Sequence, residues 1–293
     1  MRFDLVVNLD KANAAACARE AAAALLGYGA EVLLTPELDQ VLQIPGCHVL
    51  GEREAMQACD AAISIGGDGT MIHTALAALE FDKPVIGINS GRLGYLTQIE
   101  PPFGDSLAKL AAGQFEIQPR TVLSVKAYQP DGSVCHYHAL NDVVIARKMV
   151  ASMIDIEVFR SGAPFASYRA DGLIFATPTG STAYSMSAGG AIVDPGMDCL
   201  IVTPICPHSL ADRSVVLSPD ASLEVRLITR NTPPDAGVAV DGATICPMVE
   251  GSRLEISAAA RKSRFIQLSA SSFYQTLGKK LTGSEPVEIE RKV

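Results

Sequence analysis

The residues best suited to chemistry stand in the segment GGDGT at 66–70. A short apolar run at 61–65 precedes the two glycines, and residues 71–80 have the apolar spacing of a helix. A strand, a glycine turn and a helix start form an anion site, because glycine lets backbone N–H groups approach a phosphate and the helix start carries partial positive charge. The segment therefore predicts a phosphate site in a turn shaped by Gly66, Gly67 and Gly69.

Asp68 is unexpected in such a turn, because a carboxylate repels a phosphorylated ligand unless a metal or a proton intervenes. Its spacing leaves two interpretations open. Asp68 could be the N-cap of the helix that follows, a position that Asp fills well. It could instead be a general base or a metal ligand beside a phosphoryl donor.

A second candidate site lies in residues 171–195, DGLIFATPTGSTAYSMSAGGAIVDP. The pattern predicts a strand, a Pro-Thr-Gly turn and a short helix that starts near residue 181 and ends at Gly189. Ser and Thr compete for backbone hydrogen bonds, so a helix this rich in hydroxyls suits a ligand pocket better than a core, although a capped turn with a solvated hydroxyl face remains the alternative. Asn141-Asp142, before an apolar run, is by itself either a turn or a site.

These candidate sites fall in regions with different secondary-structure patterns. Strands and helices alternate over residues 1–118, which predicts a parallel sheet with right-handed crossovers in a Rossmann-like α/β domain. Short strands separated by turn signals fill residues 119–270 and predict an all-β sandwich. A last helix is predicted from Ser271 to Leu281, within a C-terminal segment at 271–293.

Composition narrows the function classes. The net charge is −8 and basic residues form no cluster, which argues against nucleic acid or an anionic membrane surface as a partner. No segment is apolar enough for a signal peptide or a membrane span, and the seven scattered cysteines are typical of a reduced, cytoplasmic protein. A Ser-His-Asp hydrolase is disfavoured, since no GxSxG elbow is present. Cationic side chains that could meet an anionic substrate locally are Arg92, Arg147, Lys148 and Arg169.

Together, five segments resemble the NAD kinase family: GGDGT at 66–70, NSGRLGYLT at 89–97, ND at 141–142, ADGLIFATPTGSTAYSMSAGGAIVDP at 170–195 and TPICPHSL at 203–210. The resemblance covers almost the whole chain and is closest to bacterial members. It implies phosphoryl transfer from ATP, or from polyphosphate, to the 2′-hydroxyl of the adenosine ribose of NAD. It also implies a divalent cation, usually Mg²⁺, a homotetramer or homodimer, and a C-terminal helix that returns to the N-terminal domain.

The resemblance also implies roles for individual residues. Asp68 would accept the proton, Asn141 and Asp142 would contact adenosine and its ribose, and Asp171 would meet the nicotinamide end. We expect Mg²⁺ to be held through the substrate phosphates, without protein ligands. No ligand role is assigned after Asp241, where Gly242-Ala243 replaces a larger residue of some relatives. The remaining residues expected to bind substrate are Arg169, near the NAD phosphates or ribose, Thr182, Ala183, Tyr184 and Ser187, in the adenine pocket, and also Ser185 and His73.

Two rival functions share parts of this pattern. Lipid kinases of the diacylglycerol kinase type carry a similar glycine turn, but the hydroxyl-rich segment at 181–187 does not suit a lipid headgroup site, which should neighbour an exposed apolar or basic surface. A non-catalytic dinucleotide sensor would have no need of Asp68 in its phosphate turn. The sequence therefore favours NAD kinase activity.

Overall fold

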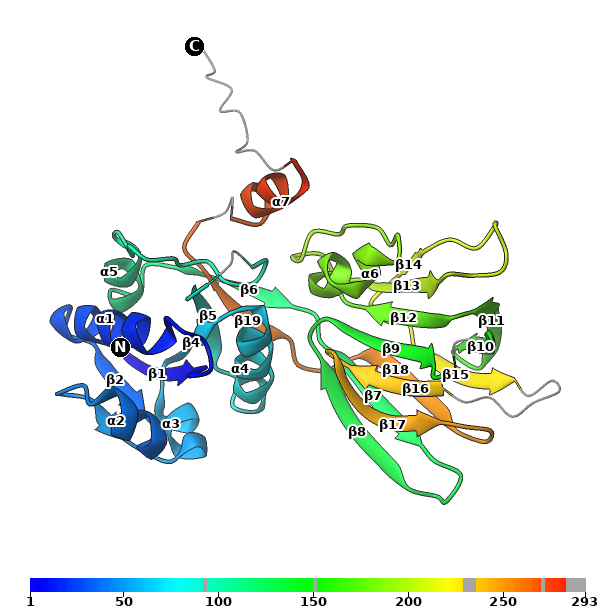
Figure 1. Ribbon diagram of the computed structural model, residues 1–293, viewed down its shortest axis with the longest axis horizontal. Coiled ribbons are helices and arrows are strands. Elements are labelled where there is room, and N and C mark those ends of the chain that lie inside the picture. The colour runs from blue at the N-terminus through cyan, green and yellow to red at the C-terminus, as the bar shows by residue number, and fades with distance from the viewer. Residues whose placement is uncertain (92–93, 150–151, 229–235, 270–271, 283–293) are drawn as a thin grey trace, which may run out of the picture. The chain divides into compact units, whose positions relative to one another are not determined.

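The computed structural model describes residues 1–91, 94–149, 152–228, 236–269 and 272–282 (Figure 1). The chain divides into two compact units. The first consists of residues 1–118 together with 264–293, and the second of residues 119–263. Within the described ranges, no helix is both long enough and apolar enough to span a membrane.

The first unit is built on a seven-stranded sheet in the order β3-β2-β1-β4-β5-β19-β6. The pairs from β3 through to β19 are parallel, as the alternation of strands and helices predicts. Its strands are β1 (Arg2–Val7), β2 (Glu31–Leu34), β3 (His48–Val49), β4 (Ala61–Gly66), β5 (Pro84–Asn89), β6 (Glu116–Arg120) and β19 (Ser263–Gln267). Its helices are α1 (Ala14–Gly27), α2 (Pro36–Leu42), α3 (Glu52–Ala58), α4 (Asp68–Glu80), α5 (Ser106–Ala111) and α7 (Ser272–Thr282).

Alternate residues of the central strands enter two separate layers. Phe3, Leu5 and Ile63 belong to one apolar cluster with α1 and α5. The intervening residues, among them Asp4 and Ser64, face the side of the sheet that carries α3 and α4, because successive side chains of a strand point to opposite faces. The carboxyl ends of β1 and β4 lie at the point where the strand order reverses, which is where open α/β sheets bind ligands.

The C-terminal part of the chain returns to the first unit, so the predicted two-domain fold is confirmed with one correction. The sandwich was expected to run to residue 270, but β19 pairs in parallel with β5 in the first sheet. A short apolar run fits a buried strand of either sheet, so its pattern does not reveal which sheet it joins. In α7, Lys280 Nζ lies 4.0 Å from the centre of the Tyr95 ring, a contact within the first unit.

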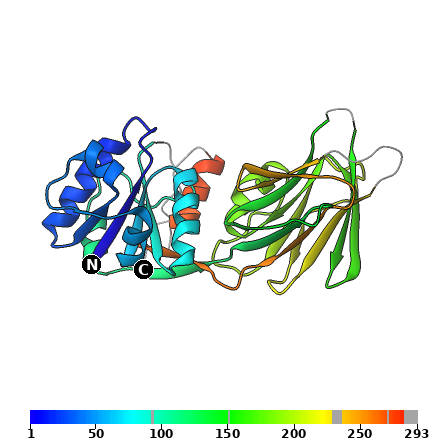
Figure 2. The same cartoon turned by 90° about the horizontal axis from the view of Figure 1, so that it is seen from below.

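The second unit is a sandwich of two six-stranded sheets, which Figure 2 shows from a second direction. Buried residues of both sheets pack against one another in one apolar core, and Val144, Ile174 and Ile201 belong to a second apolar cluster. One sheet contains β11 (Ala163–Ala170), β10 (Ile154–Arg160), β15 (Leu223–Ile228), β18 (Arg253–Ala258), β7 (Leu123–Tyr128) and β8 (Val134–Ala139). The other contains β14 (Val215–Leu217), β13 (Leu200–Ile205), β12 (Gly172–Ala176), β9 (Asp142–Arg147), β16 (Ala236–Val240) and β17 (Ala243–Met248).

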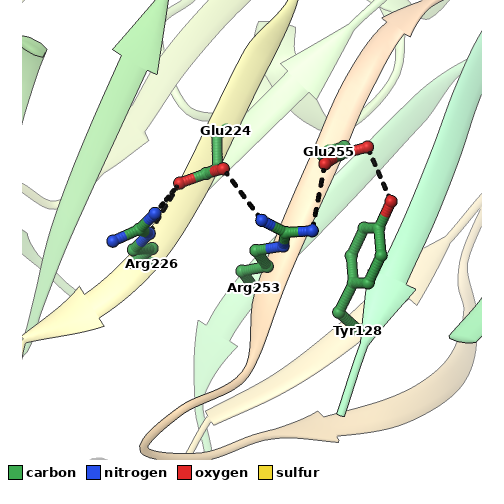
Figure 3. Close-up of polar contacts among 5 residues, drawn as sticks. All are labelled: Tyr128, Glu224, Arg226, Arg253 and Glu255. Atoms are coloured by element: carbon green, nitrogen blue, oxygen red, sulfur yellow. Dashed lines mark hydrogen bonds and ion pairs between the residues drawn. The ribbon is translucent and has the colours of Figure 1, made fainter. Parts of the chain in front are cut away.

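A charged network covers part of the outer face of the first of these sheets (Figure 3). The register places Arg226 of β15 opposite Arg253 of β18, and Glu224 opposite Glu255. Like charges directly opposite one another destabilise a sheet. Two ion pairs of Arg253, each 3.4 Å long, offset this repulsion: one runs diagonally to Glu224 of β15, and the other runs along β18 to Glu255. The Tyr128 hydroxyl donates to Glu255 at 2.9 Å and extends the network to β7.

Candidate functional site

The glycine turn joins the buried strand β4 to the N-terminus of α4. Gly67 is the N-cap, and Asp68 is the first residue of the helix. The Asp68 carboxylate does not bond to its own helix. Its two oxygens accept hydrogen bonds from the backbone N–H groups of Tyr95, at 2.8 Å, and Leu96, at 3.0 Å. The capping interpretation of Asp68 is therefore wrong, and the carboxylate is instead clamped in place by a distant segment.

The clamp requires glycine at position 94. A Cβ built there would lie 1.9 Å from Asp68 Oδ1, far inside van der Waals contact. Gly66 is required in the same way, because its Cβ would lie 2.4 Å from Thr70 Oγ1. A Cβ at Gly67 or Gly69 would meet no atom within 4 Å, so these two glycines leave open space beside the turn. That space fits the approach of a phosphate group to the backbone.

Neighbouring strand ends brace the turn. The Asn8 side-chain amide, just beyond β1, donates to Thr70 Oγ1 at 3.3 Å. The Ser90 backbone N–H, just beyond β5, donates to the Gly66 carbonyl at 3.0 Å. His73, predicted to bind substrate, is exposed on α4 and lines a cavity that residues 66–70 do not line. Asn8, which bonds to Thr70, lines the same cavity, so His73 lies on the α4 side of the glycine turn.

In the second unit, Asp241 organises the Asn141-Asp142 segment. Its carboxylate accepts three backbone N–H groups: Leu140 at 2.7 Å, Asn141 at 2.8 Å and Asp142 at 3.0 Å. Asp241 has a positive φ of 46°, a conformation that Asp and Asn tolerate better than most residues. Sequence reasoning assigned no role here. The Asp-Gly pair at 241–242 was the available signal, since it is typical of a tight hairpin turn.

Asp142 is buried at the start of β9, beside Asp241. Burial, with a smaller contribution from the charge of Asp241, raises the pKa of Asp142 from 3.8 to about 6, and the backbone N–H of Tyr184 acts in the opposite direction. Asn141 Oδ1 is buried with no hydrogen-bond partner. Buried polar atoms in proteins are nearly always paired, so an unpaired acceptor at this position indicates the place of a ligand donor.

The predicted helix after Pro178 is broken into two short pieces. A 3₁₀ turn at Thr179–Thr182 precedes a single α-turn, α6 (Tyr184–Ser187). The expected helix from 181 to 189 is therefore wrong, and the reason is the competition of hydroxyls for backbone groups. Ser181 Oγ accepts from the Val193 N–H at 3.0 Å, and Thr182 Oγ1 donates to the Thr179 carbonyl at 3.3 Å.

The predicted pocket residues differ in their surroundings. Tyr184 is 46% exposed, Ser187 is exposed and Ala183 is half-buried, so these three are accessible to a ligand. Thr182 is buried but borders this group. Ser185 is completely buried, and its hydroxyl is hydrogen-bonded to Thr203 Oγ1 at 2.9 Å. The Ser185 side chain therefore holds the turn against β13 and does not face a pocket.

A pocket of about 280 Å³ joins Asp171 to Tyr184. Arg147 and Lys148, two of the cationic side chains that could meet an anionic substrate, also line it. Arg147 pairs with Asp171 through two contacts, Nε to Oδ1 at 2.7 Å and a second nitrogen to Oδ2 at 3.1 Å. Arg169 lies exposed on β11 and does not line this pocket, and Arg92 lies outside the described residues.

The fit of a divalent cation can be judged from the donor set. In the part of the chain that the structure describes, no three His, Cys, Asp or Glu side chains gather as a metal site. Asp68 offers one half-buried carboxylate beside the open glycine turn. Such a site fits Mg²⁺, which commonly binds through one or two carboxylates, substrate phosphates and water.

A clamped carboxylate at a phosphate turn defines the class of the protein as a phosphotransferase. Comparison with protein-family models is more specific. The model of the ATP-NAD kinase N-terminal domain matches residues 3–115, and that of the ATP-NAD kinase C-terminal domain matches residues 140–268. The chain belongs to the NAD kinase family, and the resemblance seen in the sequence is confirmed.

Individual relatives cover most of the chain. The NAD kinase of Symbiobacterium thermophilum is 38% identical over 286 residues, 97% of this chain and 99% of its own. That of Magnetococcus marinus is 40% identical over 233 residues, 79% of this chain and 76% of its own. The NAD kinase from Archaeoglobus fulgidus, solved in complex with ATP, superposes with a TM-score of 0.69 at 27% identity, covering 95% of this chain and 98% of its own. Yeast NADH kinase, solved with NADH, shares the fold with a TM-score of 0.83 at 22% identity, covering 98% and 89%.

Proposed function

We propose that the chain transfers the terminal phosphoryl group of ATP to the 2′-hydroxyl of the adenosine ribose of NAD, forming NADP. The observation that carries the proposal is the clamp on Asp68, which holds a carboxylate beside an open glycine turn. Family membership and the relatives named NAD kinase support it. The first unit would bind the donor and the second the acceptor.

Asp68 would act as the proton acceptor. An ionised carboxylate offers about four acceptor positions, and the Tyr95 and Leu96 N–H groups occupy two of them. A remaining lone pair can accept the ribose hydroxyl proton as the oxygen bonds to phosphorus. Phosphoryl transfer has a loose transition state, so most of the catalysis would come from positioning and from charge neutralisation by the turn. A divalent cation held through the substrate phosphates would supply further charge neutralisation beside Asp68.

The acceptor would be recognised by hydrogen bonds. Asn141 Oδ1 would accept from the adenosine, which would remove its unpaired state, and ionised Asp142 would accept from ribose hydroxyls. Tyr184 supplies an exposed aromatic ring for the adenine, and Asp171, already oriented by Arg147, would meet the nicotinamide end. The other residues proposed for this site are Thr182, Ala183, Ser187 and Arg169, while the buried Ser185 would act only by holding the turn.

Three further features complete the proposal. Polyphosphate could replace ATP, because the glycine turn recognises phosphate without requiring a base. The protein would work in the cytoplasm, consistent with its free cysteines, and as a homo-oligomer, as the family resemblance implies. Nucleic acid and membranes would not be partners, given the net charge of −8.

A direct assay tests the proposal against its rivals. The purified chain is incubated with Mg²⁺, ATP and either NAD or diacylglycerol, and NADP and phosphorylated lipid are both measured. We expect NADP only, and no NADP when Mg²⁺ is chelated. Phosphorylation of the lipid without NADP would favour a lipid kinase, whereas NAD binding with no transfer would favour a dinucleotide sensor.

A further inference from the structure

Cys135 and Cys246 lie on strands at the same edge of the sandwich in the second unit. β8, which carries Cys135, is the last strand of one sheet, and β17, which carries Cys246, is the last strand of the other (Figure 1). β8 contacts β16, the neighbour of β17. The Gln129 side-chain amide, at the start of the turn from β7 to β8, donates to the Pro247 carbonyl of β17 at 3.2 Å. The two edge strands therefore meet across the sandwich.

Both thiols are on the core side of their strands. Cys135 pairs with Ala127 of β7, which belongs to the apolar core. Cys246 pairs with Val238 of β16, another core residue, and itself packs against the core. Directly paired residues of neighbouring strands point to the same face, so both cysteine side chains point into the space between the two sheets. Cys135 is exposed at the open edge, while Cys246 is half-buried.

The electrostatic surroundings of the two thiols overlap. Hydrogen bonding with Cys135 raises the pKa of Tyr137 most, burial adds to the rise, and the charges of Cys135 and Cys246 raise it further. Burial raises the pKa of the Cys246 thiol, the charge of Cys135 adds to this, and a hydrogen bond with Gln129 acts in the opposite direction. Since a raised pKa leaves Cys246 with less thiolate, the exposed Cys135 should react first with a dissolved reagent.

The same two strands lead into the Asp241 clamp. β8 ends at Ala139 and continues directly into residues 140–142, whose N–H groups donate to Asp241. β17 begins at Ala243, just beyond Asp241. The clamp and the pair of cysteines therefore connect the same two chain segments at different points. A bond between the thiols would hinder the separation of these segments, which opening of the clamp requires.

We propose that Cys135 and Cys246 form a modification site, at which a small disulfide such as oxidised glutathione converts the two thiols into an internal disulfide. This bond would lock the edge of the sandwich and hold the Asp241 clamp closed. Excess reduced thiol would reverse it. The site lies in the second unit alone and does not rest on the proposed NAD kinase reaction.

The modification would take place by two exchange steps. The Cys135 thiolate attacks one sulfur of oxidised glutathione, which forms a mixed disulfide and releases one glutathione thiolate. The Cys246 thiolate then attacks the Cys135 sulfur, which forms the internal disulfide and releases the second glutathione thiolate. The two cysteines are oxidised, the two sulfurs of oxidised glutathione are reduced, and the two cysteine protons end on the two glutathione thiols.

Peptide mapping and hydrogen exchange test the proposal on the full chain. The reduced protein is incubated with oxidised glutathione, its remaining thiols are alkylated, and it is cut with trypsin. The tryptic fragments 127–147 and 231–253 contain one cysteine each, Cys135 and Cys246. We expect these fragments to be joined until a reducing agent separates them. In the uncut protein, oxidation should slow hydrogen exchange of the amides of residues 140–142 about tenfold or more.

Matched serine variants supply the controls, while the wild-type peptide map remains decisive if a variant folds poorly. Cys135→Ser and Cys246→Ser should each abolish both the joined fragments and the slower exchange. Cys206→Ser replaces another exposed cysteine of the same unit and should retain both. The proposal would be overturned by glutathione retained on Cys135 without an internal disulfide, by a disulfide from either thiol to another cysteine, or by joined fragments with unchanged exchange at residues 140–142.

Discussion

Gly94→Ala should lower kcat although it replaces no residue proposed to contact a substrate. The new Cβ would lie 1.9 Å from Asp68 Oδ1 and 2.6 Å from Cγ, so the carboxylate must move by more than about 1 Å to restore ordinary contact. It would then lose good geometry with the Tyr95 and Leu96 N–H groups. A misplacement of about 1 Å in a catalytic group can cost on the order of 10²-fold in rate, so we expect kcat to fall by about that factor.

The matched control is Gly91→Ala in the same segment, where an added Cβ meets no atom within 4 Å. NADP formation from ATP and NAD is followed for both variants, and circular dichroism and thermal melting confirm that both are folded. Gly91→Ala should keep kcat near wild type. A folded Gly94→Ala enzyme with the same kcat as Gly91→Ala would refute the claim that the clamp positions the catalytic base.

Three other substitutions probe the remaining carboxylates. Asp68→Asn should lower kcat by roughly 10²–10⁴ while NAD still binds, since it removes the proton acceptor. For Asp142, kcat/KM for NAD should fall below pH about 6 and the Asp142→Asn profile should be flat there. Because folding raises this pKa from 3.8 to about 6, the free energy of unfolding of the wild type should fall by up to about 3 kcal/mol relative to that of Asp142→Asn as pH rises from about 4 to about 6. If the difference in unfolding free energy between the two proteins did not change with pH, the burial of Asp142 would be contradicted. Asp241→Asn tolerates the positive φ but loses one acceptor, so we expect KM for NAD to rise about tenfold with kcat nearly unchanged; an equal fall in kcat would assign Asp241 to the chemistry.

Local sequence patterns predicted the strand, turn and helix of the site. They did not predict which distant segments contact one another. The strand, glycine turn and helix at 61–80 are consecutive in sequence, so their spacing reveals them. Asp241 lies about a hundred residues from Asn141, and no local pattern records that its carboxylate receives that N–H group. The same limit applies to β19, whose apolar run does not encode its partner β5. Ser185 shows a third limit, because a hydroxyl in a ligand segment can point inward as well as outward.

The substitution Asp68→Asn has two effects at once. It removes the carboxylate charge, and it places an amide donor against the Tyr95 or Leu96 N–H group. A double-mutant cycle with Gly94→Ala tests whether Gly94 acts through the Asp68 carboxylate. If Gly94 acts only by keeping the Asp68 carboxylate in place, the second substitution has nothing left to disturb once that carboxylate is gone. The double variant should then have the kcat of Asp68→Asn alone. Additive losses, on the order of 10⁴–10⁶ in kcat when the separate effects are multiplied, would show that Gly94 serves the reaction by a route that does not pass through Asp68.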